Sequence, residues 1–402
     1  MPKKRIDQIE VRGKRVLMRV DFNVPLKDGK ITDDRRIRAA MPSIKSVLDR
    51  SGRLVLISHL GRPKGAGYEK EFSLEPCAAR LGELLGRGRP AMFPSHDCID
   101  GSATAAVNLL QESQVVLLEN LRFHKAEQKG ESEFALRLAA YAEIYCNDAF
   151  GTCHRPDASM VAVPRALVGK PRVCGFLVEK EIRYLSDALS KPARPFVVVL
   201  GGAKVSDKLP AIENLLPRAD AILVGGAMAY TFLKAQGKKV GASRVEDDRL
   251  ADARRILDAA ARGKCRIHLP IDHVCAARFE ETASPKPVSG EIPDGLMGLD
   301  IGPKTVAEFG AVLRAAKTVV WNGPMGVFEW SAFAAGTKGV GEAIVAATSA
   351  GATSIVGGGD SAAAAEEFGF ADRLSHVSTG GGASLEMLEG RKFESVELLD
   401  NA

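Results

Sequence analysis

The chain has 402 residues, of which 46% are hydrophobic, and a formal net charge of +5. This length exceeds what one hydrophobic core normally serves, so two or three domains are expected. The longest apolar runs, such as residues 196–200, are far shorter than the ~20 residues of a membrane helix, and the start MPKKRIDQIEV lacks the apolar core of a secretory signal. These features exclude a membrane-spanning protein and predict a cytoplasmic enzyme.

Charge is shared unevenly between the two halves. Residues 1–174 hold 29 basic against 21 acidic residues, a net charge of +8, and residues 175–402 hold 26 against 29, a net charge of −3. The first half is therefore expected to bind an anion. Nucleic acid is disfavoured as that anion, because the basic residues stand singly within separate motifs. The seven scattered cysteines, without a C-x-x-C pair, favour reduced thiols over a disulfide framework or a zinc site.

Apolar segments rich in β-branched residues recur along the chain, each followed by a helical pattern. Strands that are apolar on both faces and alternate with helices are typical of parallel sheets covered by helices. The segments are residues 15–24, 53–61 and 114–123 in the first half, and 195–204, 221–229, 318–326, 353–361 and 374–382 in the second. We therefore predict an α/β protein with two such sheets. Ligands of these folds bind beyond the carboxyl ends of the strands.

In the first half, polar and basic residues stand at these strand ends. They are Asp21 and Asn23 in RVDFNVP, His59 and Arg62 in SHLGRP, Arg122 in LENLRF and Arg155 in CHRPD, with Arg36 opening a helix after DD. A guanidinium is a rigid fork that matches phosphate and carboxylate oxygens. A single arginine is more often a surface residue or part of an ion pair. Four of them gathered at one sheet edge predict a site for a small polyanion.

Between the halves, leucines and an isoleucine at helical spacing predict a helix over residues 177–190, which ends before Pro192 and Pro195. We interpret it as a helix joining two domains. The first domain is then residues 1–174 and the second residues 175–388, and the tail 389–402 is too short to fold alone.

In the second half, glycine-rich strand ends dominate. Lys204 and Lys208 in LGGAKVSDK lie four residues apart and are expected at the start of a helix. The P-loop pattern G-x-x-x-x-G-K-[ST] is absent from the sequence. The other glycine-lined ends contain Gly225, Gly226, Gly298, Asn322 and Glu329. Such ends let a flat base or a phosphate approach the backbone closely, although a glycine that packs a helix looks the same.

The segment SIVGGGDSAAAAEE, residues 354–367, is a strand, a glycine turn and a helix. Three interpretations fit it: a dinucleotide site, a mononucleotide held with a metal at Asp360, or a tight turn without a ligand. The dinucleotide interpretation lacks the acidic residue expected on the ribose about 20 residues later. Asp360 suits Mg²⁺, which binds one or two carboxylates together with nucleotide phosphates, but it also suits a helix N-cap.

Nine motifs in order, from residue 17 to about 390, resemble those of phosphoglycerate kinases. They are RVDFNVP, SHLGRP, LLENLRFHKAE, NDAFGTCHR, LGGAKVSDK, MGLDIGPKT, WNGPMGVFE, VGGGDSAAA and STGGGASLEMLEG. The resemblance implies two Rossmann-like domains that face each other across a cleft, a C-terminal tail that returns to the first domain, and a monomer. It also implies Mg²⁺-dependent phosphoryl transfer between 1,3-bisphosphoglycerate with ADP and 3-phosphoglycerate with ATP.

The resemblance also implies roles for individual residues. The phosphoglycerate residues are Asp21, Asn23, Arg36, His59, Arg62, Arg122 and Arg155, with Arg36 nearest the transferred group. The nucleotide residues are Lys204, Lys208, Gly225, Gly226, Gly298, Asn322, Glu329, Gly358, Gly359, Asp360 and Ser361, with Glu329 on the ribose and Asp360 on the metal. The stretch GTCHRPDAS departs from the usual family pattern at Cys153, Pro156 and Asp157, and Asp157 brings a negative charge toward an anion site.

The chemistry fits these residue types. In the ATP-consuming direction the acceptor is a carboxylate, which is ionised at neutral pH and needs no base. Positive charge and positioning are required instead, and we expect them from Arg36, Lys204, Lys208, Mg²⁺ and the N–H groups around Gly381. A dinucleotide-dependent dehydrogenase and a non-catalytic nucleotide-binding protein remain the alternatives. Because the ligands fall on different domains, hinge bending near residues 177–190 is expected.

Overall fold

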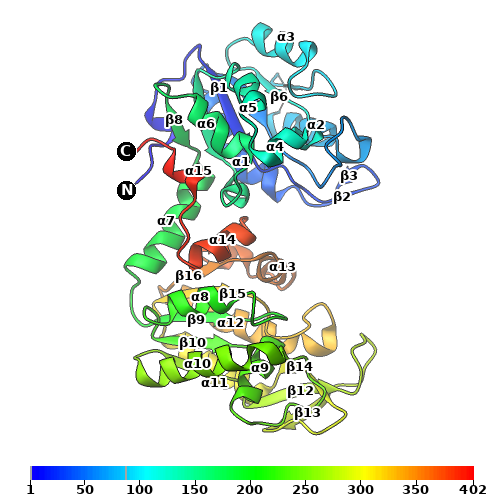
Figure 1. The fold of residues 1–402 in the computed structure, drawn as a ribbon, viewed down its shortest axis with the longest axis vertical. Helices are drawn as coiled ribbons and strands as arrows, with labels where there is room; N and C mark the ends of the chain where they lie inside the picture. The colour runs from blue at the N-terminus through cyan, green and yellow to red at the C-terminus, as the bar shows by residue number, and fades with distance from the viewer. Residues whose placement is uncertain (1, 87) are drawn as a thin grey trace. The chain divides into compact units, whose positions relative to one another are not determined.

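A computed structural model describes residues 2–86 and 88–402 of the chain (Figure 1). Its contacts group residues 2–182 with 392–402 as a first compact unit and residues 183–391 as a second. Each unit is built on its own six-stranded sheet. None of the described helices is both long enough and apolar enough to cross a membrane.

The first unit contains an all-parallel sheet in the order β5-β6-β4-β1-β7-β8. Its strands are β1 (Arg15–Val20), β4 (Arg53–Ile57), β5 (Ala91–Met92), β6 (Val115–Leu117), β7 (Ile144–Asp148) and β8 (Arg172–Cys174), with a separate hairpin of β2 (Leu26–Lys27) and β3 (Lys30–Ile31). Its α-helices are α1 (Arg35–Leu48), α2 (Glu75–Leu85), α3 (Gly101–Leu109), α4 (Lys125–Lys129), α5 (Ser132–Ala139), α6 (Val163–Ala166) and α15 (Glu394–Glu397). Short turns η1 (Ile6–Gln8), η2 (Lys70–Phe72), η3 (Leu121–Phe123), η4 (Phe150–Thr152) and η5 (Ala158–Ala162) connect them.

The side chains of the central strands point alternately to the two faces of the sheet, and apolar residues pack on both. Val16, Met18 and Val20 of β1 pack with apolar residues of α1 and α2 in one buried cluster. Leu17 and Arg19, the intervening residues, are also fully buried, which shows that the other face of the strand is covered as well. The sheet is therefore covered on both faces, as the apolar strand pattern predicts.

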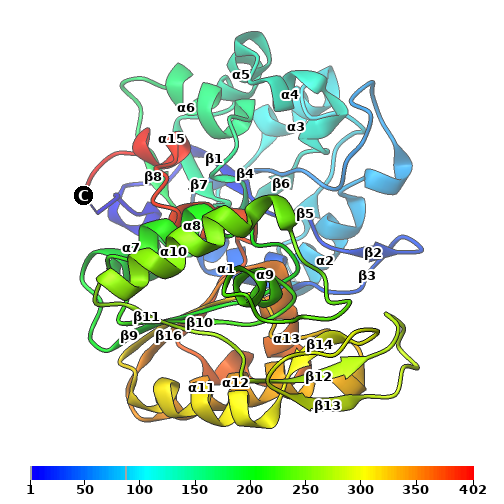
Figure 2. The same cartoon turned by 60° about the horizontal axis from the view of Figure 1, so that its bottom comes forward.

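The second unit contains an all-parallel sheet in the order β11-β10-β9-β15-β16-β17, and Figure 2 shows α10 and α11 on its opposite faces. Its strands are β9 (Phe196–Leu200), β10 (Ala221–Val224), β11 (Arg266–His268), β15 (Thr318–Asn322), β16 (Thr353–Val356) and β17 (His376–Val377). Its helices are α8 (Leu209–Leu215), α9 (Met228–Ala235), α10 (Leu250–Arg262), α11 (Pro303–Ala315), α12 (Ala335–Ser349), α13 (Gly359–Glu367) and α14 (Gly382–Leu388), with turns η6 (Asp247–Arg249), η7 (Ser331–Phe333) and η8 (Ala371–Arg373).

A second, antiparallel sheet in this unit was not expected from the sequence. It has the order β13-β12-β14, with β12 (Asp272–Ala276), β13 (Lys286–Ser289) and β14 (Met297–Ile301). The strand β13 is mostly exposed and has no apolar run, so hydrophobic periodicity gives no signal for it. The predicted α/β class with two helix-covered parallel sheets is nevertheless confirmed.

The helix α7 (Phe176–Ser190) spans the division between the units, whereas the sequence-based boundary lies at 174/175. Its first turn is held by the first unit, because Ser43 Oγ accepts a hydrogen bond from Phe176 N (2.8 Å) and Asp148 Oδ1 accepts one from Leu177 N (2.9 Å). Further along, Tyr184 stacks on His376 of the second unit, with ring centroids 4.9 Å apart. The division therefore falls inside the helix.

The C-terminal residues add to the edge of the first unit beside β8. Asp400 N donates to Arg172 O (2.7 Å), and Lys4 N donates to Asp400 O (2.8 Å), so that both ends of the chain lie side by side (Figure 1). Ser395 Oγ donates to Cys153 O at 2.7 Å. The tail was expected to begin at residue 389, but residues 389–391 belong to the second unit.

Asp148, the last residue of β7, is completely buried and accepts hydrogen bonds from Leu177 N (2.9 Å) and Val178 N (3.3 Å) at the start of α7. Burial raises the pKa of Asp148 to about 7, although these hydrogen bonds favour the charged form. The unfolded value is about 3.9. Ionisation is therefore harder in the folded state than in the unfolded one.

Substituting Asp148→Asn is expected to flatten the pH dependence of stability. In the wild type, the contribution of Asp148 to the free energy of unfolding falls as pH rises from about 4 to about 7, because Asp148 resists ionisation. The amide oxygen of asparagine can accept the same two backbone bonds without this cost, which is at most about 4 kcal/mol for the shift from 3.8 to about 7. Urea unfolding at pH 5 and pH 8 measures the difference, and equal pH slopes in both proteins would contradict the assignment.

Candidate functional site

The predicted site residues of the first unit lie where the strand order reverses. The strand β1 stands between β4 and β7, and Asp21 and Asn23 follow β1 directly while His59 follows β4. Arg122 lies in η3 after β6, and Arg155 follows η4. A reversal point at the carboxyl ends of parallel strands is the usual ligand position in this kind of sheet.

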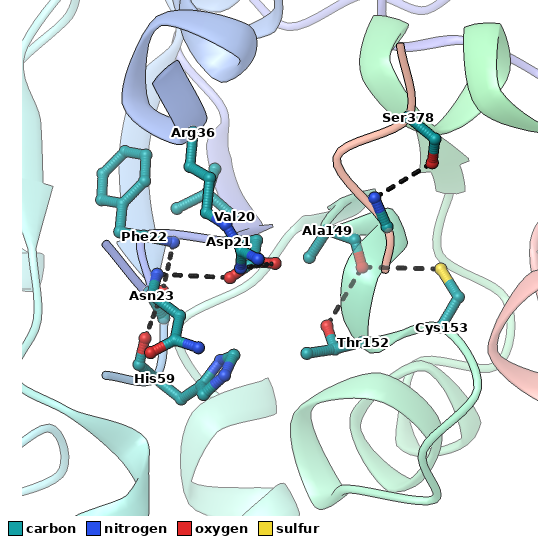
Figure 3. A network of polar contacts seen from close by, with 12 residues as sticks. Val20, Asp21, Phe22, Asn23, Arg36, His59, Ala149, Thr152, Cys153 and Ser378 are labelled. Carbon is teal, nitrogen blue, oxygen red and sulfur yellow. Dashed lines mark hydrogen bonds and ion pairs between the residues drawn. The ribbon is translucent and has the colours of Figure 1, made fainter. Parts of the chain in front are cut away.

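Arg36, the second residue of α1, is held by Asp21. Its Nη1 donates to Asp21 Oδ2 at 2.6 Å, and Asp21 Oδ1 accepts from Asn23 N at 3.2 Å (Figure 3). The Arg36 side chain is 33% exposed and that of Asp21 only 7%. Asn23 Oδ1 in turn accepts from Gly61 N at 2.8 Å. Asp21 and Asn23 thus position the arginine and the loop after β4, and the arginine keeps an exposed face.

His59 is buried against a cluster of arginines. Its Nδ1 lies 3.0 Å from Arg19 Nη2, and since a guanidinium only donates, Nδ1 is the acceptor. Burial, together with the charges of Arg19, Arg122, Arg155 and Arg36, lowers the pKa of His59 well below its ordinary value. The ring is therefore neutral and presents Nε2–H as a donor. Arg36, Arg122 and Arg155 are thus near enough to His59 for their charges to act on it.

Arg122 is nearly inaccessible and is paired with Asp157. Its Nη1 donates to Gly61 O at 3.0 Å, and its Nη2 lies 3.6 Å from Asp157 Oδ2. Burial lowers the pKa of Arg122, and the charge of Asp157 opposes this shift. The buried Nε and Nη2 of Arg122 have no hydrogen-bond partner in the described chain. Asp157 supplies the counter-charge beside this buried guanidinium.

The two remaining predicted arginines are more accessible. Arg62 is exposed and Arg155 is half-buried, and neither forms an ion pair within residues 2–86 and 88–402. Their charge is therefore not neutralised by a neighbouring carboxylate. Together with Arg36, they give this edge of the sheet a positive, solvent-accessible side.

Arg19 and Glu127 were not predicted, and both are buried beside this cluster. Arg19 is fully buried in β1, where its Nε donates to Ser159 Oγ at 3.0 Å. Ser159 Oγ donates to Glu127 Oε1 at 2.5 Å, and burial raises the pKa of Glu127 although Arg19 lowers it. An arginine in the middle of the apolar run RVLMRV was the available signal, because a charge in a buried strand must find partners.

In the second unit the order also reverses, between β9 and β15, and the backbone there is tightly packed. A Cβ on Gly201 would lie 2.0 Å from Pro324 O, and Gly226 has a φ of +66°. Beside these turns lies a pocket of about 460 Å³, whose lining includes Gly226, Gly298, Glu329 and Asp360. Four of the predicted nucleotide residues are thus brought to one cavity.

Lys208 and Asn322 meet beside this pocket. Lys208 Nζ donates to Asn322 Oδ1, burial lowers the pKa of Lys208, and the charges of Asp207 and Asp360 oppose that shift. A Cβ on Gly358 would lie 3.0 Å from Asn322 Nδ2, and this buried amide nitrogen has no hydrogen-bond partner in the described chain. Ser361 Oγ accepts from Gly323 N at 2.5 Å. The turn before α13 therefore packs against the end of β15.

The expectation that Lys204 and Lys208 open a helix is wrong for Lys204. The helix α8 begins at Leu209 with Pro210 in its first turn, Lys208 is its N-cap, and Lys204 lies exposed in the turn before it. Proline fits the first turn of a helix, where its missing N–H is not needed. Pro210 therefore favours a helix that starts at Leu209, after Lys204.

The remaining predicted glycines have different surroundings. A Cβ on Gly225 would lie 2.4 Å from Met325 Sδ, so this glycine packs against a side chain below the pocket. Gly359 is the first residue of α13 and is exposed. Gly381 is the N-cap of α14 with a φ of +46°. The preceding Gly380 N already donates to Ser378 Oγ at 3.0 Å, so not every N–H of this turn is available.

Asp360 is suited to a magnesium ion. It is exposed, lies in the first turn of α13 rather than at the N-cap position, which Gly358 occupies, and lines the pocket. Within the described residues it belongs to no group of three metal-binding side chains. A single carboxylate fits an ion that takes its other oxygens from phosphates and water.

Arg244 and Phe279 are among the pocket residues that were not predicted. Arg244 is exposed and has no ion pair in the described part of the chain. Phe279 is 65% exposed, and its ring centroid lies 4.7 Å from that of Trp330. Arg244 follows the turn at Gly241 and Phe279 follows the end of β12, but neither belongs to one of the nine motifs, and the fold brings both to the cavity.

Comparison with known proteins agrees with this geometry. The phosphoglycerate kinase family model matches residues 6–391. The chain is 57% identical over 406 residues to a phosphoglycerate kinase of Rhodopirellula baltica, with 100% of each sequence covered, and 52% identical over 395 residues to one of Anaeromyxobacter dehalogenans, with 98% of each covered.

Solved structures are similar as well. The phosphoglycerate kinase of Coxiella burnetii matches with a TM-score of 0.89 and 38% identity, covering 99% of this chain and 98% of that one. The enzyme of Pyrococcus horikoshii matches with a TM-score of 0.84 and 32% identity, covering 98% of both. From the family match, the identities and these folds, the chain belongs to the phosphoglycerate kinase family.

Proposed function

We propose that the chain catalyses reversible phosphoryl transfer between 1,3-bisphosphoglycerate with ADP and 3-phosphoglycerate with ATP. The observation that carries this proposal is the pair of unlike sites at strand-order reversals, a cluster of arginines in the first unit and a glycine-lined pocket in the second. A cluster of guanidiniums suits a small phosphorylated acid. A pocket with an accessible backbone suits a nucleotide.

In the first unit, we assign the phosphoglycerate to Arg36, Arg62, Arg122 and Arg155, with His59 donating from Nε2. The unpaired charges of Arg62 and Arg155 and the position of Arg122 beside His59 support this assignment. Asp21 and Asn23 act by fixing Arg36 and the loop at Gly61. The arginine forks then orient the ligand's phosphate and carboxylate oxygens.

In the second unit, we assign the base to the pocket at Gly226 and Gly298 and the ribose to Glu329. The phosphates are assigned to Lys204, Lys208, Asn322 and the turn from Gly358 to Ser361, and Gly225 packs against Met325. Asp360 would hold Mg²⁺, which when bound neutralises charge on the nucleotide phosphates.

The chemical step needs no proton to be removed, because the acceptor carboxylate is already ionised at neutral pH. His59, buried and neutral with Nδ1 bound to Arg19, is suited to donating a hydrogen bond and unsuited to acting as a base. Arg36 and Lys208 supply positive charge to the phosphoryl oxygens in transfer, and Lys204 and the turn at Gly381 add donors.

Two alternatives have distinct signatures. A dinucleotide-dependent dehydrogenase would need an acidic residue after β17, where Ser378 and Thr379 stand instead. A non-catalytic nucleotide-binding protein would bind Mg-ADP without forming ATP, and a coupled assay from 1,3-bisphosphoglycerate distinguishes it. Hinge bending at the helix over residues 177–190, a monomeric state and a cytoplasmic location stay predictions.

Substituting Arg36→Ala is expected to lower kcat by roughly 10² or more, the range seen when one electrostatic stabiliser is removed. The coupled assay for ATP formation measures this. Arg38→Ala is the matched control, because Arg38 lies on the same helix and forms an exposed ion pair with Asp34. Near-normal turnover of the Arg36 variant, or an equal loss in the control, would reject the assigned role.

Substituting Asp157→Asn is expected to lower the KM for 3-phosphoglycerate by about fivefold at low ionic strength, because a buried negative charge beside Arg122 opposes a second anion. The KM for Mg-ATP should not change, and thermal stability should fall because Arg122 loses its buried counter-charge. Steady-state kinetics at two salt concentrations provide the measurement. A higher or unchanged KM for 3-phosphoglycerate would show that Asp157 does not compete with the ligand.

A further inference from the structure

The side chains of Asp97, Cys98 and His124 converge in the first unit, outside both sites assigned above. One ligand atom of each lies within 4.8 Å of the other two, and this is the sole group of three such side chains in the described chain. We propose that these residues bind a divalent transition metal of the zinc type. Nothing in the proposed phosphoryl transfer uses this group.

The donor set favours zinc over the alkaline-earth ions. A thiolate, an imidazole and a carboxylate are the side chains that Zn²⁺ takes, at about 2.0–2.3 Å each. Mg²⁺ and Ca²⁺ take oxygen ligands and would leave the sulfur unused. Three protein ligands leave a fourth tetrahedral position, which water can fill. On binding, a Zn–S bond forms at Cys98 and the thiol proton passes to the solvent.

Two of the three ligands are already oriented. Asp97 Oδ1 accepts a hydrogen bond from Ile99 N at 2.7 Å, which directs Oδ2 toward His124 Nε2 at 3.0 Å. The His124 ring packs on Phe134, with centroids 5.2 Å apart, and its backbone N donates to Leu121 O at 3.1 Å. Contacts of this kind, which fix ligands from outside, are what metal sites require for tight binding.

Access and burial also fit a metal site. Cys98 is completely buried, while the side chains of Asp97 and His124 are 33% and 27% exposed. The solvent therefore reaches the carboxylate and the imidazole, while the sulfur is protected. The ion would replace the present hydrogen bond between Asp97 and His124, and the three ligand atoms need only a small contraction to coordinate it.

Titration of the reduced, full-length protein with Co²⁺ as the probe tests the proposal. Cobalt gives a thiolate-to-metal charge-transfer band and visible bands typical of tetrahedral coordination, and Zn²⁺ should displace it. We expect one equivalent of Co²⁺ to bind with both signals. Cys98→Ser should abolish the charge-transfer band, and Asp97→Asn and His124→Gln should each weaken binding at least about tenfold.

His268→Gln is the matched control, because His268 pairs with Glu308 at 2.9 Å as His124 pairs with Asp97, but has no cysteine in such a group. This variant should bind Co²⁺ like the wild type. Absence of a charge-transfer band in the wild type, or its survival in Cys98→Ser, would overturn the proposal. If Cys98→Ser does not fold, unchanged affinity in both Asp97→Asn and His124→Gln would overturn it equally.

Discussion

Buried positive charge in the first unit is the constraint on which the arrangement of its site depends. Arg19 is fully buried and Arg122 is only 3% exposed, and a guanidinium without partners in such a place is very costly. His59 and Ser159 accept hydrogen bonds from Arg19, and Ser159 in turn donates to Glu127. Asp157 forms an ion pair with Arg122. These partners fix the arginines before a ligand arrives. An anion then meets donors that need little reorganisation.

The candidate site of the second unit is formed mainly by closely packed backbone, whereas that of the first unit is formed mainly by charged side chains. Its pocket is lined by glycines, apolar side chains and few charged ones, and its turns approach so closely that Gly201 could not carry a Cβ. Lys208 is oriented by Asn322, and Asp360 is the exposed carboxylate near it. A charged site in one unit and a glycine-lined pocket in the other suit a transfer between a small acid and a nucleotide. The ionised acceptor carboxylate needs no general base, and the neutral His59, whose Nδ1 already accepts from Arg19, is not placed to act as one.

The long central strands and the residues at their ends could be predicted, because β1, β4, β9 and β15 are mostly apolar and are followed by polar or glycine motifs. Short edge strands such as β5 and β11 have too few residues for a periodic signal. Networks such as Arg19 with Ser159 join residues 140 positions apart, and they follow from topology that one sequence does not reveal. The metal-binding group was hidden for the same reason, because His124 is far from Asp97 and Cys98 in the chain and does not match zinc-motif spacing.

Hydrogen–deuterium exchange with each ligand alone tests most directly whether the two ligands occupy different units. The account predicts that 3-phosphoglycerate protects amides around residues 21–23, 59–62 and 121–123, and that Mg-ADP protects those around 225–226, 323–329 and 357–361. Protection of the same unit by both ligands would contradict it. So would protection of the second unit by 3-phosphoglycerate alone.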